Sequence, residues 1–240
     1  MKLKRIILIF CIAITMISTG CRKTIPVDQS VFIQDGSTLS NGTLHYVRLP
    51  KDWGFSSDYS YRIGTVKGGN ALLASDENGT FVKERKEFLA DMDFAPWVRE
   101  DYVFPDVCGD DFIVEIYGRT HDLIILDGQA REEFIAWLRS YINSSNEQPE
   151  TEYEKLSSFG IPDILNNLKY VVGGVAMNCI SNPGLAYNPD FNLLLIDNKL
   201  YITDRIGNSY DNMYVVGSFD EDSPIYQVVK ESMLRGRTQD

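Results

Sequence analysis

The order of hydrophobic and polar residues predicts short strands interrupted by a few helices. Two apolar runs at 112–117 and 123–126, separated by a short polar segment, have the length and β-branched content of a hairpin. Asp127 follows as a predicted N-cap, and apolar residues then recur at three- and four-residue spacing up to residue 142. This hairpin followed by a helix is the clearest structural signal in the chain.

Weaker patterns cover the rest of the sequence. A second hairpin is predicted across residues 197–199. Apolar residues at helical spacing predict a helix that begins after Thr80 and ends before Pro96. Ser223 and Pro224 predict the start of a C-terminal helix. The remaining predictions are strands at 31–33, 44–49, 61–66, 71–74, 170–179 and 215–219, and a short helix opening at 161–165.

These elements predict an α+β fold, with an antiparallel sheet of hairpins and helices packed on one face. Residues 30–240 are expected to form a single domain. A polar stretch at 143–154 is the candidate boundary, and it would divide this domain into two sub-units. A chain of 240 residues that is 44% hydrophobic is long enough and apolar enough to bury such a core.

The N-terminal segment has the pattern of a bacterial export signal. Lys2, Lys4 and Arg5 precede an apolar stretch at 6–17, and small residues follow it. At 1.5 Å per residue this stretch spans about 18 Å, which is too short for a membrane-spanning helix. The pattern therefore predicts a signal peptide at 1–20.

The end of this segment resembles the lipobox of bacterial lipoproteins. Gly20 directly precedes Cys21 and Thr19 is compatible with the motif, whereas Ser18 departs from the usual leucine. The resemblance covers residues 1–21 and implies that Cys21 becomes a lipidated N-terminus. The alternative is an ordinary cleaved signal in which Cys21 is incidental.

The residue after the lipidated cysteine guides sorting in enteric bacteria, where an aspartate retains lipoproteins in the inner membrane. Arg22 stands there, so the resemblance implies an anchor in the outer membrane that faces the periplasm, with 21–29 as a polar tether. Removal of 1–20 takes away three cations and no acid, so the formal net charge would change from −11 to −14. This acidity argues against nucleic-acid binding and favours a basic protein partner.

Two cysteines, Cys108 and Cys179, lie within the predicted domain. In an oxidising periplasm they are a candidate disulfide, and closing so long a loop would stabilise the fold by about 4 kcal/mol. The alternative is two separate buried thiols, because free cysteine is among the residue types most often buried. The spacing leaves both alternatives open.

Motifs for catalysis and metal binding are missing from the sequence. It contains no G-x-S-x-G elbow, no H-E-x-x-H, no C-x-x-C pair and no phosphate-binding loop. The segment 76–79 looks only faintly like a calcium loop, because its glycine comes too early. We expect a non-enzymatic protein with no metal site and no other cofactor. A hydrolase with an unrecognised pair of carboxylates is an alternative.

Aromatic residues gather in two segments that read as loops. The candidates for ligand contact are Trp53, Phe55, Tyr59, Trp97 and Tyr102. Exposed rings would stack on sugars or anchor a protein partner. Buried rings would instead cover the edges of the sheet.

These features predict a non-enzymatic, periplasm-facing lipoprotein, held at the membrane by its N-terminal lipid, that binds a macromolecular partner. By analogy of class we expect an immunity-type protein that neutralises an antibacterial effector. A lipid anchor, an acidic domain and the missing catalytic motifs fit that class. The alternative is a carbohydrate- or cell-wall-binding lipoprotein that uses the loop aromatics.

Overall fold

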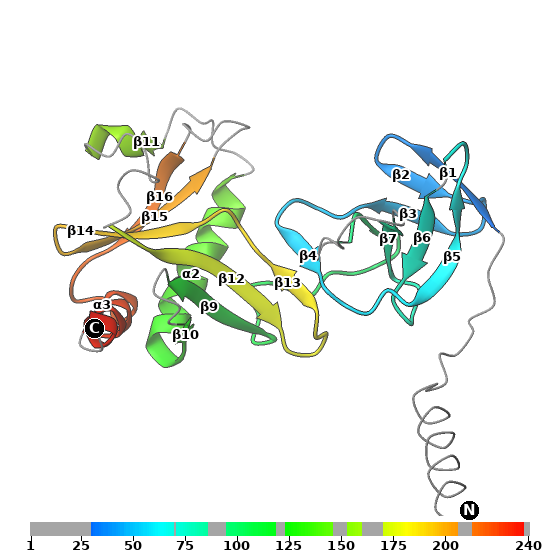
Figure 1. Cartoon of the computed structure of the whole chain (residues 1–240). Helices are drawn as coiled ribbons and strands as arrows, with labels where there is room; N and C mark the ends of the chain where they lie inside the picture. Colours follow the sequence, from blue (N-terminus) through cyan, green and yellow to red (C-terminus); the bar gives the residue numbers. More distant parts are fainter. Residues whose placement is uncertain are drawn as a thin grey trace, which may run out of the picture.

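The computed structural model describes residues 30–69, 71–85, 95–118, 123–145, 153–159, 170–205 and 213–237. Within these residues the chain is mostly β. It forms a closed barrel and a nine-stranded sheet, which stand side by side in Figure 1. The predicted signal peptide and tether, including Cys21, and the short helix predicted at 161–165 lie outside the described residues.

Seven short strands from the first part of the chain form the barrel. In barrel order they are β1 (Val31–Asp35), β2 (Thr38–Ser40), β3 (His45–Arg48), β8 (Trp97–Arg99), β7 (Phe81–Arg85), β6 (Leu72–Ser75) and β5 (Tyr61–Val66). All neighbours are antiparallel except β1 and β5, whose parallel pairing closes the barrel. Its interior is filled by six buried side chains: Phe32, Leu39, Tyr46, Leu73, Val82 and Trp97.

Barrel closure brings the backbone of β1 very close to β5. Gly64 has a φ of +154°, and a Cβ atom at this position would lie 2.2 Å from the carbonyl oxygen of Ser30. Ser30 also donates its hydroxyl to the carbonyl of Ile63 at 2.7 Å. Glycine is needed at residue 64 because any side chain would collide with the neighbouring backbone.

The second sheet is built mainly from the later part of the chain. Its strand order is β10 (Leu123–Leu126), β9 (Phe112–Gly118), β12 (Val171–Cys179), β14 (Asn192–Ile196), β15 (Lys199–Arg205), β16 (Met213–Phe219) and β11 (Glu154–Lys155). Off this path, β13 (Leu185–Tyr187) pairs with β12 and with β4 (Trp53–Phe55). All of these pairings are antiparallel.

A second hydrophobic cluster, separate from the barrel interior, joins the barrel to the sheet. Strand β4 leaves the barrel segment to pair with β13, and both lie between the two bodies in Figure 1. Phe55 of β4 stacks on Phe81 of the barrel at a centroid distance of 3.9 Å. The same hydrophobic cluster continues through Phe112 and Phe134 into the sheet and its helices.

Two α-helices occur in the described part of the chain, α2 (Gly128–Ser145) and α3 (Pro224–Arg237), together with the 3-10 helix η2 (Leu156–Phe159). Ser223 caps α3 as predicted, since its Oγ accepts the backbone N–H of Tyr226 at 3.3 Å. Glu133 of α2 adds a second acceptor, because its Oε2 receives the N–H of Ile225 at 3.1 Å. A carboxylate at this end of α3 also complements the helix dipole.

The predicted fold class, α+β with an antiparallel sheet of hairpins and helices packed on one face, is wrong. The mostly β architecture depends on a closed barrel, whose parallel β1–β5 contact joins residues more than thirty apart. The helix predicted after Thr80 is also wrong at its start, because Phe81–Arg85 is the strand β7. Partners β6 and β8 on both sides of β7 override the helical spacing of its apolar residues.

The hairpins at 112–126 and 192–205, the helix after Asp127 and the C-terminal helix are confirmed. No described helix has both the length and the apolar character that a membrane crossing requires.

Candidate functional site

One surface of the β9–β10 hairpin presents an unusual number of apolar side chains. The side chains that face the core along these strands are buried, as period-two alternation requires. On the opposite side, Ile113, Tyr117, Leu123 and Ile125 are 38–53% exposed. Tyr117 lies directly across from Leu123, so the four form one continuous surface. We call this surface the outer face.

The rest of the same side of the sheet is covered. Cross-strand pairing places Tyr117, Gly174 and Asn192 on one side, and Leu194 lies two residues further along β14. Leu194 is fully buried against Leu156 of η2, so η2 shields the sheet at β14–β16. The strand β10 ends the described strand order, which leaves the outer face at an edge of the sheet.

A carboxylate lies in the middle of the outer face. Glu115 is directly opposite Ile125, and its Oε2 accepts hydrogen bonds from the Tyr117 hydroxyl and, at 2.7 Å, from Asn178 Nδ2. The hydrogen bond to Glu115, together with burial, raises the pKa of Tyr117. The outer face therefore combines apolar contact area with one oriented negative charge.

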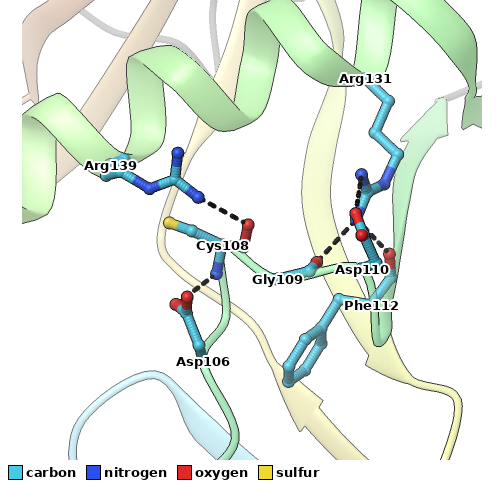
Figure 2. A network of polar contacts seen from close by, with 7 residues as sticks. All are labelled: Asp106, Cys108, Gly109, Asp110, Phe112, Arg131 and Arg139. Carbon is cyan, nitrogen blue, oxygen red and sulfur yellow. Dashed lines mark hydrogen bonds and ion pairs between the residues drawn. The ribbon is translucent and has the colours of Figure 1, made fainter.

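Helix α2 holds the turn that leads into β9. Arg131 donates to the carbonyls of Gly109 at 2.7 Å and Phe112 at 3.3 Å, and it lies 3.4 Å from the Asp110 carboxylate. Arg139 donates to the carbonyl of Cys108 at 3.1 Å. Figure 2 shows both guanidinium groups reaching from the helix to this turn. These contacts from Arg131 and Arg139 hold the turn against α2, directly before the first residue of the outer face, Ile113.

The candidate disulfide is not formed in the structure, in which Cys108 and Cys179 are both buried free thiols. Burial, with Asp106 nearby, raises the pKa of Cys108, although Arg139 acts in the opposite direction. Cys179 instead donates its thiol to Asp111 Oδ2 at 3.3 Å. The two sulfurs thus have separate surroundings, which matches the alternative of two buried thiols.

The buried thiols should resist modification in the folded protein. We expect iodoacetamide to leave Cys108 and Cys179 unmodified under native conditions and to alkylate both after denaturation, because both thiols are buried away from the reagent. At Cys108 the raised pKa adds to this protection. Peptide mapping by mass spectrometry measures each site separately. Recovery of a peptide that links Cys108 to Cys179 would contradict the structure.

The five predicted contact aromatics do not form a common platform. Phe55, Tyr59 and Trp97 are buried in the core, so they are not available to an external ligand, and this part of the prediction is wrong. They are buried because the segments that contain them are strands or pack on the barrel–sheet junction. Trp53 and Tyr102 are partly buried at the same junction.

Tyr102 lines a hollow between the barrel and the sheet. This hollow has a volume of about 540 Å³ and is bounded by the β6–β7 turn, the segment 102–105 and residues 181–182 after β12. Asn182 donates to the Tyr102 hydroxyl at 3.3 Å, so these two of its polar side chains are hydrogen-bonded to each other.

The segment 76–79 is a structural turn and not a calcium loop. Asp76 Oδ1 accepts the backbone N–H groups of Thr80 at 2.7 Å and Phe81 at 2.8 Å, and Oδ2 accepts that of Asn78 at 3.3 Å. Amide hydrogens that point at a carboxylate oppose a cation in the same place. Among the residues that the structure describes, no group of three or more His, Cys, Asp or Glu side chains is arranged to hold a metal ion.

Comparisons with protein-family models, with curated proteins and with solved structures found no match to this chain. The functional argument therefore depends on its own surfaces. Sequence reasoning missed the outer face because apolar strands such as 123–126 read as buried on both sides. One sequence signal could have revealed the outer face. The single helix predicted after Asp127 can cover only one side of the hairpin, which leaves the other side exposed.

Proposed function

We propose that this chain is a non-enzymatic lipoprotein that binds a basic protein partner through the outer face, and that it neutralises an antibacterial effector in this way. The observation that carries the proposal is the exposure of Ile113, Tyr117, Leu123 and Ile125 on one continuous surface at the edge of the sheet. Contiguous exposed apolar patches on soluble domains mark interaction sites.

The energetics of the outer face suit a protein partner. Full burial of one large apolar side chain contributes about 1.5–3 kcal/mol, and the outer face offers three aliphatic side chains and one aromatic ring. Tyrosine is enriched at binding hot spots because it combines contact area with a polar group. Among the described strands β10 pairs only with β9, so a partner strand could add to its other edge.

The charge of the chain favours a basic partner. The formal net charge is −11, and Glu115 places a carboxylate within the contact surface itself. Complementary charge accelerates encounter and disfavours acidic competitors. A lysine or arginine of the partner that faces Glu115 would pair with its less occupied oxygen.

Replacement of Ile125 by lysine tests the proposal. The assay measures binding of the full-length chain to each purified product of its neighbouring genes, and the toxicity of that product with and without the chain. One basic product is expected to bind and lose its toxicity. I125K should weaken this binding about a hundredfold, because it removes an apolar contact and repels a basic surface.

Leu234→Lys is the matched control, since Leu234 on α3 is 55% exposed and Ile125 is 53% exposed. L234K should bind within about twofold of the unmodified chain. The proposal fails if no neighbouring product binds, or if I125K and L234K reduce binding equally.

A further inference from the structure

The hollow between the barrel and the sheet is large enough to hold a small ligand. Its volume of about 540 Å³ lies within the range of about 300–1,000 Å³ that is usual for small-molecule sites. Three separate parts of the chain line it: the β6–β7 turn with Asn78 and Thr80, the segment before β9 with Tyr102 and Phe104, and the residues after β12 with Asn182. A ligand in the hollow would therefore contact residues of the barrel and of the sheet at the same time.

The two polar side chains on the barrel side of the hollow are accessible and free to bind. Asn78 is exposed and Thr80 is partly exposed. Both use their backbone N–H groups to bond Asp76, and neither side chain has a hydrogen-bond partner among the residues that the structure describes. They supply an amide, which donates and accepts, and a hydroxyl, which does the same.

Tyr102 and Asn182 also keep hydrogen-bonding capacity, although they bond each other. Asn182 Nδ2 donates to the oxygen of Tyr102 at 3.3 Å, so the phenol hydrogen remains available to an acceptor and Asn182 Oδ1 remains available to a donor. The hollow thus presents donors and acceptors side by side. A ligand hydroxyl matches such a pair because it donates and accepts at once, whereas a peptide N–H or carbonyl group does only one of the two.

Aromatic rings supply the apolar part of the lining. The rings of Tyr102 and Phe104 are partly exposed and meet at 90° with their centroids 5.0 Å apart. Phe104 packs on Trp53 at 4.6 Å and Tyr102 on Phe81 at 5.1 Å, so the core holds both rings in place. The C–H groups of a sugar ring pack on such aromatic surfaces, while its hydroxyls remain free to form hydrogen bonds.

The charges of the hollow disfavour ionic ligands. Of the described residues that line it, only Asp76 is charged, and both oxygens of this carboxylate already accept backbone N–H groups of the turn. An anionic ligand would find no lysine, arginine or histidine in this lining, and it would be repelled by Asp76. A cation would find only a carboxylate that the turn already uses. The lining therefore favours a ligand without charge.

We propose that this hollow binds a neutral carbohydrate. Sugar hydroxyls would bond the side chains of Asn78, Thr80 and Asn182, and the sugar ring would pack against Tyr102 and Phe104. None of the residues of the outer face lines the hollow, so this proposal goes beyond the proposed function and does not rest on it.

Titration of the full-length chain with neutral disaccharides tests the proposal. The probes are cellobiose, maltose, lactose and N,N′-diacetylchitobiose, which differ in linkage and in ring substituents. At least one is expected to bind saturably with a Kd below about 5 mM. Calorimetry measures the affinity, and tryptophan fluorescence gives a second readout because Trp53 packs against Phe104 in the lining.

Asn78→Ala removes one polar side chain of the hollow. We expect N78A to weaken binding of the disaccharide about tenfold, because a sugar hydroxyl loses its partner. Folding should be unaffected, since the side chain of Asn78 bonds no other described residue. Asn143→Ala is the matched control, because Asn143 on α2 is exposed and does not line the hollow. N143A should bind within about twofold of the unmodified chain.

Thr80→Val is an independent variant that keeps the shape of the side chain. It replaces the hydroxyl by a methyl group and leaves the backbone bond to Asp76 in place. T80V should weaken binding of the disaccharide about fivefold. Thr43→Val makes the same change at an exposed position outside the hollow and should have less than about a twofold effect.

The proposal is overturned if none of the four disaccharides binds saturably up to about 50 mM. It is also overturned if a disaccharide binds but N78A and T80V hold it as tightly as N143A and T43V do, because the sugar would then lie elsewhere on the chain. N-acetyl-trialanine amide is the last probe. Saturable binding of this peptide without binding of any disaccharide would assign the hollow to a peptide instead.

Discussion

Replacement of Gly173 by alanine should lower the free energy of unfolding by at least about 3 kcal/mol. A Cβ atom at this position would lie 2.1 Å from the carbonyl oxygen of Tyr117 and 2.6 Å from its carbonyl carbon. Both atoms belong to the backbone of β9, so no side-chain rotation relieves the collision. The strands β9 and β12 must then separate locally, and their pairing runs from Phe112 to Gly118. Urea denaturation followed by circular dichroism measures the loss.

The adjacent glycine provides an unusually close control. A Cβ at Gly174 would meet only the carbonyl oxygen of Phe191, at an ordinary contact distance of 3.7 Å. G174A should therefore stay within about 1 kcal/mol of the unmodified chain. Equal destabilisation by G173A and G174A would mean that the register between β9 and β12 differs from the one described here.

Asp76→Ala is expected to cost about 3 kcal/mol of stability. The Asp76 carboxylate accepts backbone N–H groups from three residues of the β6–β7 turn, and Ser75 Oγ lies 3.2 Å from its Oδ1. Asp76 and Ser75 are buried, so water replaces these bonds poorly when the carboxylate is removed. The turn joins two barrel strands, and its loss would loosen the barrel at this point.

Glu77→Ala is the control for this turn, because Glu77 is exposed and carries the same charge. E77A should change the free energy of unfolding by less than about 0.5 kcal/mol. Asp76→Asn keeps one acceptor and should fall between the two. Thermal unfolding of the three variants gives the order of their stabilities directly. Equal midpoints for D76A and E77A would show that the Asp76 carboxylate does not stabilise the turn.

Local signals predicted the elements whose partners are near in sequence. The hairpin at 112–126, the helix after Asp127 and the cap at Ser223 depend on residues within about twenty positions. The strand β7 was misread as the start of a helix, because its apolar residues have helical spacing and its partners determine its conformation. The buried positions of Phe55, Tyr59 and Trp97 likewise follow from the barrel–sheet junction, which no local pattern encodes.

The sequence by itself determined where most strands and the two described helices lie, and it determined the acidic charge balance of the chain. Period-two and period-3.6 patterns and capping residues act over short distances, so they are readable without a partner strand. Only the tertiary structure decided the closure of the barrel and the exposure of one side of β9–β10. These features depend on contacts between residues far apart in the chain, and their energies arise only when the strands have paired.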